Sequence, residues 1–359
     1  MRAFRKATIR EVASRAGVST TTVSLFVGGR EAVCSSETAQ RIRQAVEELN
    51  YTPNSLTRGL RSKSQTTLGV CLASPMDPEV RFGAFFLESM WRGIIAQADE
   101  DNYCLLHYPA RLRIDGPHSG LLDGRVDGIL LLDHSRPKAK ALVSAGMPTV
   151  VLASALDLPI GCGAAYADDR GTSLLAIEHL WQLGHRRIAH VAGPVGWRAS
   201  AHLTAKHKSD SCGDDVALER LDGYIELMTE RCAFDPDLIA YPQAWDEANL
   251  TGDFARWRAM RNPPTAVYCV NDAIAATAVS AARSLGMSVP EDMSIVGVDD
   301  SEVARSLGLT SVVVPIYAVG RAGVTAVLSL IAGLPIDQCR IQVPVTELVA
   351  RASTAPLIH

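Results

Sequence analysis

Two kinds of hydrophobic pattern divide the chain. Residues 8 to 49 carry apolar positions at helical spacing, in three short stretches separated by glycine or serine. From residue 67 onward, short runs of consecutive apolar residues alternate with longer amphipathic stretches. The first pattern is typical of a small helical domain, and the second is typical of strands and helices that alternate around parallel sheets. We therefore predict a small all-α domain followed by an α/β region with doubly wound parallel sheets.

Caps and apolar faces predict three helices in the N-terminal region. Thr8 begins the capping box Thr-Ile-Arg-Glu, so a helix should start after it and end at Gly17. Ser19 can cap a second helix, and Ser35 or Ser36 a third. The residues expected to face inward are Val23 and Phe26 in the second helix and Ile42, Val46 and Leu49 in the third. A helix, a tight glycine turn and further helices form the helix-turn-helix pattern.

Three consecutive threonines, Thr20, Thr21 and Thr22, lie at the start of the second helix. Threonine is a mediocre helix former because its branched Cβ restricts χ1, so the run needs a reason. In a helix-turn-helix unit the second helix enters the major groove, where hydroxyl groups can bond bases or phosphates. We expect Thr20 and Thr21 to contact DNA and Thr22 to face a phosphate. The alternative is that all three only cap and solvate the helix.

Charge is distributed unevenly along the chain. Residues 1–64 hold eleven Lys and Arg against five acidic residues, a balance of +6, so the total of −4 leaves −10 for residues 65–359. A basic head on an acidic body favours a polyanion as the partner of the head, although an ordinary solvated surface would also fit. The eight cysteines contain no CxxC pair, and we expect neither a metal site nor a cofactor.

The stretch TIREVASRAGVSTTTVS, residues 8–24, resembles the helix-turn-helix signature of the LacI/GalR family of bacterial transcriptional repressors, and the likeness continues through residues 35–60. The resemblance implies a DNA-binding head at 1–50 and a hinge helix and linker at 51–65 that folds on the operator. Leu60 stands where the family inserts a leucine into the minor groove as an apolar wedge. The DNA contacts expected in the head and hinge are Thr8, Ser19, Thr20, Thr21, Thr22, Ser24, Leu25, Asn54, Thr57, Arg58 and Leu60.

Two residues depart from the family pattern in the DNA-binding part. Family members usually carry Arg or His at the position of Leu25, and leucine cannot hydrogen-bond to a base. Gly59 stands in the hinge, where glycine weakens a helix by roughly 1 kcal/mol relative to alanine. We therefore expect an operator that departs from the family consensus and a hinge that is less stable off DNA.

Polar residues follow several of the predicted strands of the body. They are Asp133, Asn271 with Asp272, and Asp299 with Asp300. In open α/β sheets, ligands bind beyond the carboxyl ends of the strands. The stretches predicted to form these strands are TLGVCLAS, YCLLHYP, VDGILLLD, MPTVVLAS, RRIAHVAG, AVYCVND and MSIVGVDD.

The body also resembles the family, through VDGILLL, EHLWQLGHRRIAHVAGP, RLDGY, VYCVNDAIA and LGMSVPEDMSIVGVDD. The implied fold is a periplasmic-binding-protein-like pair of subdomains, at 66–165 plus 291–318 and at 166–290 plus 319–359, with three crossings and an effector in the cleft. The connection at 195–219 is longer than the family norm, and we expect it to shape the effector pocket. The effector contacts implied by the resemblance are Phe85, Phe86, Asp133, Arg220, Trp245 and Asp272.

The function expected is a repressor, a homodimer on a pseudo-palindromic operator, switched by a small-molecule effector. A carbohydrate is the family default for the effector, and a purine is the runner-up. The alternative is a solute-binding protein without a regulatory role; the basic head and the lack of a secretory signal favour a cytoplasmic regulator. An enzyme is not expected, and no catalytic residues are predicted, because the sequence contains no G-x-S-x-G, P-loop or G-x-G-x-x-G motif.

Overall fold

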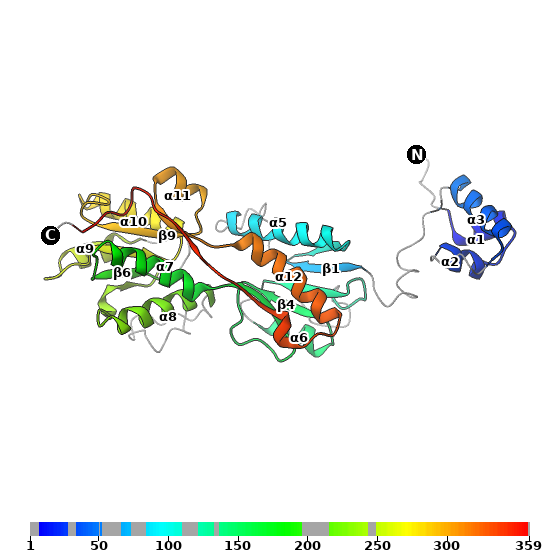
Figure 1. Cartoon of the computed structure of the whole chain (residues 1–359), viewed down its shortest axis with the longest axis horizontal. Helices are drawn as coiled ribbons and strands as arrows, with labels where there is room; N and C mark the ends of the chain where they lie inside the picture. The colour runs from blue at the N-terminus through cyan, green and yellow to red at the C-terminus, as the bar shows by residue number, and fades with distance from the viewer. Residues whose placement is uncertain are drawn as a thin grey trace. The chain divides into compact units, whose positions relative to one another are not determined.

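A computed structural model describes residues 7–27, 34–49, 51, 66–72, 84–109, 121–132, 136–195, 215–242 and 249–357. The chain divides into two compact units, Met1–Thr66 and Thr67–His359. The described part of the first unit is helical, and the second unit combines helices with strands (Figure 1). The expected combination of a helical head and an α/β body is confirmed.

The head contains the helices that the caps predict, α1 (Ile9–Ala16), α2 (Thr20–Val27) and α3 (Ser36–Glu48). Thr8 accepts a hydrogen bond from the Glu11 N–H, and the Glu11 carboxylate accepts one from the Thr8 N–H at 2.8 Å. Gly17 ends α1 with φ +66°, a left-handed conformation that glycine adopts without a Cβ penalty. Ser35, rather than Ser36, caps α3.

Apolar side chains from all three helices form the core of the head. Val23 and Phe26 are buried, as their spacing predicts, and Ile42 is fully buried at the centre of α3. Val46 and Leu49 are only half-buried and pack at the edge of this core, so the inward stripe of α3 is shifted relative to the prediction. The buried residues of the head are Val12, Ala13, Ala16, Val23, Phe26, Ala39, Ile42 and Ala45.

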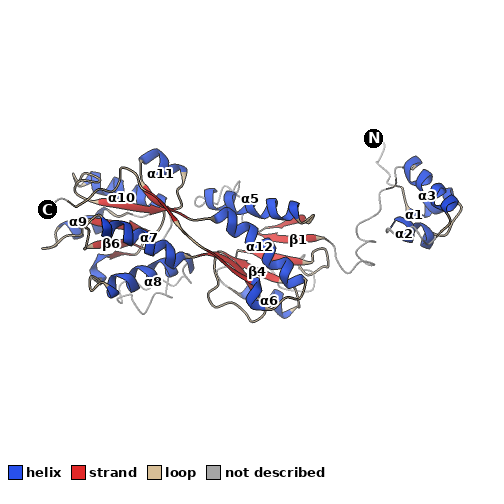
Figure 2. Ribbon diagram, in the orientation of Figure 1, coloured by secondary structure: helices blue, strands red, loops and turns tan. Residues whose placement is uncertain are grey.

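The described residues of the body form two six-stranded sheets (Figure 2). The first has the order β11-β5-β4-β3-β1-β2 and the second β12-β10-β9-β8-β6-β7, and every pairing is parallel except that of β12 with β10. The strands of the first sheet are β1 (Thr67–Cys71), β2 (Cys104–Tyr108), β3 (Gly128–Leu131), β4 (Thr149–Leu152), β5 (Gly163–Ala167) and β11 (Arg340–Val343). Those of the second are β6 (Ile188–Val191), β7 (Ile239–Ala240), β8 (Ala266–Cys269), β9 (Ser294–Val298), β10 (Thr310–Val313) and β12 (Glu347–Val349).

Helices cover the faces of the two sheets. No helix within the described ranges is both long and apolar enough to cross a membrane. The helices of the body are α5 (Ala84–Glu100), α6 (Pro137–Ser144), α7 (Asp169–Gln182), α8 (Asp215–Glu230), α9 (Thr251–Arg258), α10 (Asp272–Ser284), α11 (Glu302–Leu307) and α12 (Ile316–Ile331), with short 3-10 helices at Pro236–Leu238 and Ile336–Cys339.

Successive residues of the first sheet pack against different helices. Leu130 and Val150 share a core with residues of α5 and α12, whereas Ile129 and Val151 pack with α6. This alternation follows from the two-residue period of a strand, because neighbouring side chains point to opposite faces. Helices on both faces of a parallel sheet define the doubly wound fold that the sequence predicts.

The expected assignment of the last two segments to the subdomains is wrong. Within 291–318, β9 and β10 belong to the second sheet, where β9 pairs with β8 and β10 pairs with β9. Within 319–359, most of α12 and all of β11 belong to the first subdomain, because β11 pairs with β5. The reason is that strand pairing joins segments far apart in the chain, and an apolar run does not reveal its partner. The chain still crosses three times, after β5, β10 and β11.

A close approach of α5 and α12 fixes one side of the first subdomain. A Cβ on Gly93 of α5 would lie 2.0 Å from the Tyr317 carbonyl oxygen, and a Cβ on Gly320 of α12 would lie 2.4 Å from the Met90 carbonyl oxygen. Only glycine at both positions permits this distance between the helix backbones. Arg321 of α12 and Glu100 of α5 also form a bidentate ion pair, with N–O distances of 2.8 and 2.6 Å.

Candidate functional site

The start of α2 divides its hydroxyl groups between a cap and the surface. The Ser19 hydroxyl accepts a hydrogen bond from the Thr22 N–H at 3.0 Å and lies 2.8 Å from the Thr22 hydroxyl oxygen. The side chains of Thr20 and Thr21 are exposed. Ser19 and Thr22 therefore order the first turn, while Thr20 and Thr21 present their hydroxyl and methyl groups to the outside.

The other residues predicted to contact DNA have different surroundings. Thr8 is exposed and holds the capping box of α1. Ser24 and Leu25 are half-buried on α2. The predicted hinge contacts lie outside the described residues, so the structure gives no account of Asn54, Thr57, Arg58 and Leu60.

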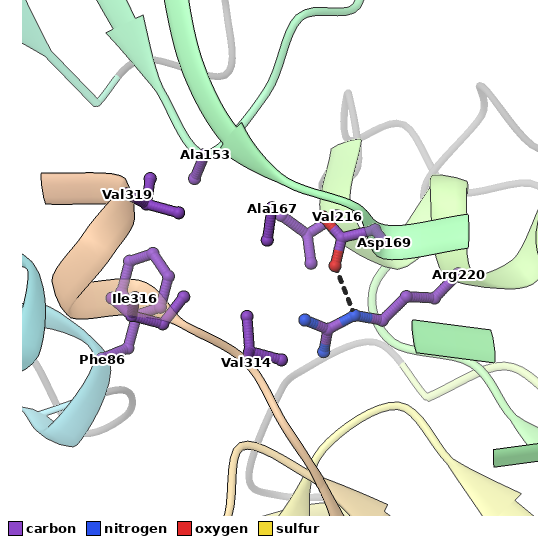
Figure 3. Close-up of a pocket in the computed structure, with 9 residues that line it drawn as sticks. All are labelled: Phe86, Ala153, Ala167, Asp169, Val216, Arg220, Val314, Ile316 and Val319. Carbon is purple, nitrogen blue, oxygen red and sulfur yellow. Dashed lines mark hydrogen bonds and ion pairs between the residues drawn. The ribbon is translucent and has the colours of Figure 1, made fainter. Parts of the chain in front are cut away.

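A small pocket lies between the two subdomains of the body (Figure 3). It is beyond the carboxyl ends of β4 and β5 in the first sheet and of β10 in the second, the place where α/β sheets bind ligands. The first subdomain contributes α5 and α12, and the second contributes α7 and α8. The described residues that line it are Phe86, Ala153, Ala167, Asp169, Val216, Arg220, Val314, Ile316 and Val319.

Arg220 is the cation among the described residues that line this cavity. Its Nε donates to Asp169 Oδ1 at 2.7 Å and its Nη1 donates to the Val270 carbonyl at 2.6 Å. Only 4 % of Arg220 is exposed, and Figure 3 shows its guanidinium directed toward the cavity. Because two of its five N–H groups are engaged in this way, the plane of the guanidinium is fixed, and it can present donors to an oxygen-bearing ligand.

Carboxylates surround this arginine. Burial disfavours the charged guanidinium, but the carboxylates of Asp169 and Asp299 raise the pKa of Arg220 above its ordinary value. Burial raises the pKa of Asp299, and the positive charge of Arg220 opposes that rise. Burial also raises the pKa of Glu219 to about 7, with Asp169 and Asp215 contributing. Asp169 and Arg220 are the polar residues in the described lining of the cavity, and Asp299 and Glu219 belong to the charges around them.

The structure brings together two of the six residues predicted to contact an effector. Phe86 and Arg220 line the cavity, whereas Phe85 does not and is 39 % exposed. Asp133 and Trp245 lie outside the described residues.

Asp272 has well-defined partners within the second subdomain. Its Oδ1 accepts from the Ser311 hydroxyl at 2.6 Å and its Oδ2 accepts from the Ser301 N–H at 2.8 Å. These bonds tie the start of α10 to β10 and to the segment before α11. Asp272 is not in the described lining of the cavity, so its contact with an effector stays a prediction.

Sequence reasoning missed Asp169 and left Asp299 without a role. Asp169 follows β5, a strand of small residues, GAAYA, that lacks the branched apolar run by which the other strands were recognised. Asp299 was noted only as a polar strand end. Its φ of +107° is unusual for a residue with a Cβ, and such strain clusters at functional sites.

The long connection before Arg220 is shorter than predicted. The sequence places it at 195–219, but α8 begins at Asp215, so Arg220 lies in the second turn of a helix. Residues 196–214 lie outside the described part of the chain, and their effect on the pocket stays a prediction.

Comparisons with known proteins agree with this architecture. The model of bacterial regulatory proteins of the lacI family matches residues 8–54, and that of the periplasmic binding protein-like domain matches 177–354. The transcriptional repressor PurR of Aliivibrio fischeri is 30 % identical over 353 residues, covering 90 % of this chain and 92 % of PurR.

Two solved structures are similar to this chain in fold as well as in sequence. One is the lac repressor dimer bound to operator and the anti-inducer ONPF, with 25 % identity, a TM-score of 0.73 and coverage of 98 % of this chain and 100 % of that one. The other is a complex of the transcriptional regulator CelR with cellobiose, with 26 % identity, a TM-score of 0.66 and coverage of 97 % and 100 %.

Proposed function

The chain belongs to the LacI family of bacterial regulatory proteins, and we propose that it is a repressor whose affinity for operator DNA is switched by a small molecule bound between the subdomains of its body. The observation that carries this proposal is the presence, in one chain, of a helix-turn-helix head and a cavity with a fixed arginine. A regulatory role, and not solute binding alone, is the shared function of its relatives.

The head reads DNA with the exposed start of α2. Thr20 and Thr21 can each donate or accept a hydrogen bond at a base edge or a phosphate, and their methyl groups can touch thymine. Thr22 is engaged in the cap, so its contribution is to orient the turn. Residues 51–65 act as the hinge, with Leu60 as the apolar wedge in the minor groove.

The body transmits the effector signal by linkage. An effector that binds one arrangement of the two subdomains more tightly than another shifts the population toward that arrangement. If the same arrangements differ in operator affinity, effector and operator change each other's affinity by the same factor. The cavity supports this mechanism because its lining comes from both subdomains, so a bound ligand would contact both of them.

The effector carries hydroxyl groups, as a sugar does. Arg220 and Asp169 offer a donor and an acceptor side by side at the cavity, which suits hydroxyl recognition. The likeness to the CelR complex with cellobiose supports a carbohydrate. The likeness to the lac repressor dimer on its operator supports a homodimer on a pseudo-palindromic site.

Operator selection from random DNA with the purified full chain tests this function. The salt concentration must be fixed, because phosphate contacts make affinity depend on salt. Enrichment of a pseudo-palindrome is expected, and the selected site should bind the wild type more tightly than a variant with both Thr20 and Thr21 changed to alanine. A lack of any enriched site would contradict the proposal, and no effect of cellobiose or other sugars on operator affinity would contradict the carbohydrate part alone.

A further inference from the structure

The side chains of α2 carry neither a charge nor an amide group. The helix reads TTTVSLFV, and all eight of its residues are described. In the major groove, Arg and Lys bond guanine, Asn and Gln bond adenine, and Asp and Glu bond cytosine. Since α2 contains none of these residue types, its side chains meet base edges with hydroxyl groups and with methyl groups.

Thr21 and Leu25 form the outward ridge of this helix. Val23 is fully buried, and the residues two before and two after it are each rotated by about 200° around the helix axis. Thr21 and Leu25 therefore point away from the core of the head, and at a spacing of four residues they are neighbours. Thr21 is exposed and Leu25 is half-buried. The ridge thus presents one hydroxyl group beside the methyl groups of Thr21 and Leu25.

Contacts at both ends of α2 fix its rotation. At the start, the Ser19 hydroxyl accepts a hydrogen bond from the Thr22 N–H at 3.0 Å. Near the end, the guanidinium carbon of Arg43, on α3, lies 5.4 Å from the centre of the Phe26 ring, a cation–π contact. Val23 packs between them in the core of the head. A rotation that moved Leu25 off the outward ridge would break these contacts.

We propose that Leu25 reads the C5-methyl group of a thymine, so that each half-site of the operator carries a thymine facing this residue. Thymine is the base with a methyl group in the major groove, and contact between this methyl and leucine removes apolar area of both from water. Leucine against cytosine or guanine would instead cover a hydrogen-bonding group and leave it without a partner. The inference rests on the proposed function, because it names a base in the DNA that the head binds.

Replacement of thymine by deoxyuridine tests the proposal, because deoxyuridine lacks only the methyl group. The full chain first selects its operator from random DNA, and each thymine of a half-site is then replaced in turn. Fluorescence anisotropy at fixed salt gives the affinity for each DNA. At one thymine of each half-site the replacement should weaken binding about three- to fivefold, the effect of uncovering one methyl group. Replacement in both half-sites should weaken binding about tenfold or more, because the two losses multiply.

Variants of the head assign that methyl group to Leu25. Leu25→Ala should bind the thymine and deoxyuridine operators about equally at this position, whereas Leu25→Met, which keeps an apolar side chain of similar size, should keep the ratio. Val46→Ala removes methyl groups from a half-buried position of α3 and should also keep it. Each ratio compares two DNAs on one protein preparation, so a smaller folded fraction in a variant does not change it.

The proposal is overturned if no thymine responds to the replacement, or if Leu25→Ala keeps the ratio of the wild type. It is also overturned if Val46→Ala loses the ratio as Leu25→Ala does. A chain that selects no operator contradicts the proposed function and this inference together. A chain that selects an operator but binds it equally well without the methyl group contradicts this inference alone.

Discussion

Arg136 and Asp215 form a buried ion pair that joins the two subdomains of the body. Arg136 directly precedes α6 of the first subdomain, and its Nη2 donates to Oδ2 of Asp215, the first residue of α8 in the second. The side chain of Arg136 is 13 % exposed and that of Asp215 is fully buried. Arg136 also donates to the Leu156 carbonyl and the Ser154 hydroxyl, both at 3.0 Å, so the first subdomain holds the guanidinium in place.

Replacing Arg136 with methionine should destabilise the body and alter the response to effector. The change removes the cation that pairs with the fully buried carboxylate of Asp215. Breaking a buried ion pair in this way costs about 3–5 kcal/mol of stability. It also removes a link between subdomains whose arrangement is proposed to carry the signal. Urea unfolding gives the free energy, and operator binding with and without effector gives the coupling.

The exposed pair of Arg170 and Glu226 provides the control for this prediction. Their N–O distance is 2.6 Å, but both side chains are more than half exposed and both lie in the second subdomain. Arg170→Met should change the free energy of unfolding by less than about 1 kcal/mol, as is usual for exposed pairs. Equal effects of the two substitutions would show that the buried pair stabilises the body no more than an exposed pair does.

Gly93→Ala should strongly destabilise the first subdomain. The new Cβ would lie 2.0 Å from the Tyr317 carbonyl oxygen, so α5 and α12 must move apart. Overpacking of this kind costs about 1–3 kcal/mol or more. Gly252→Ala is the matched control, because a Cβ there meets nothing within 4 Å and alanine favours a helix by up to about 1 kcal/mol. Thermal unfolding should place the two variants on opposite sides of the wild type.

The stability of the second subdomain should fall in acid because of His190. This residue is fully buried between the rings of Tyr224 and Tyr268, with ring centroids 4.9 and 4.6 Å away. Burial lowers the pKa of His190 to about 3, from an ordinary value of 6.5. Between these values the unfolded chain binds a proton that the folded chain does not, so stability is complete above pH 6.5 and is lost as pH falls toward 3.

Replacing His190 with phenylalanine, which can occupy the same place between the rings, tests this prediction. The difference in unfolding free energy between wild type and variant should be constant above pH 6.5. Below that pH the wild type should lose up to about 1.4 kcal/mol per pH unit relative to the variant. Parallel curves over the whole acid range would mean that His190 titrates normally in the folded protein.

Leu25→Arg should change the sequence of the preferred operator. Leu25 lies half-buried in the second turn of α2 and has no group that can hydrogen-bond to a base. An arginine can bond the O6 and N7 of guanine, which discriminates against other bases by about 1–3 kcal/mol. Repeating the operator selection with this variant should enrich guanine at one position of each half-site. An unchanged operator would place Leu25 away from the base edges.

Local chemistry determined the elements of this protein. The capping box at Thr8, the left-handed turn at Gly17 and the cap at Ser19 act over a few residues, and the sequence alone was enough to place α1 and α2. The apolar runs that became β1, β3, β4 and β8 are recognisable for the same reason, since a strand buried on both faces needs consecutive apolar residues. The strand GAAYA was missed because alanine and glycine carry little strand signal.

The tertiary structure decided which elements belong together and which polar residues face the cavity. Strand pairing assigned β9 and β10 to one sheet and β11 to the other, because ladders join segments that are distant in the chain. Side-chain hydrogen bonds gave Asp272 its partners within the fold and joined Asp169 to Arg220. The sequence by itself determined the kind of protein, its helices and most of its strands. The geometry of the site depended on packing between residues that no local pattern connects.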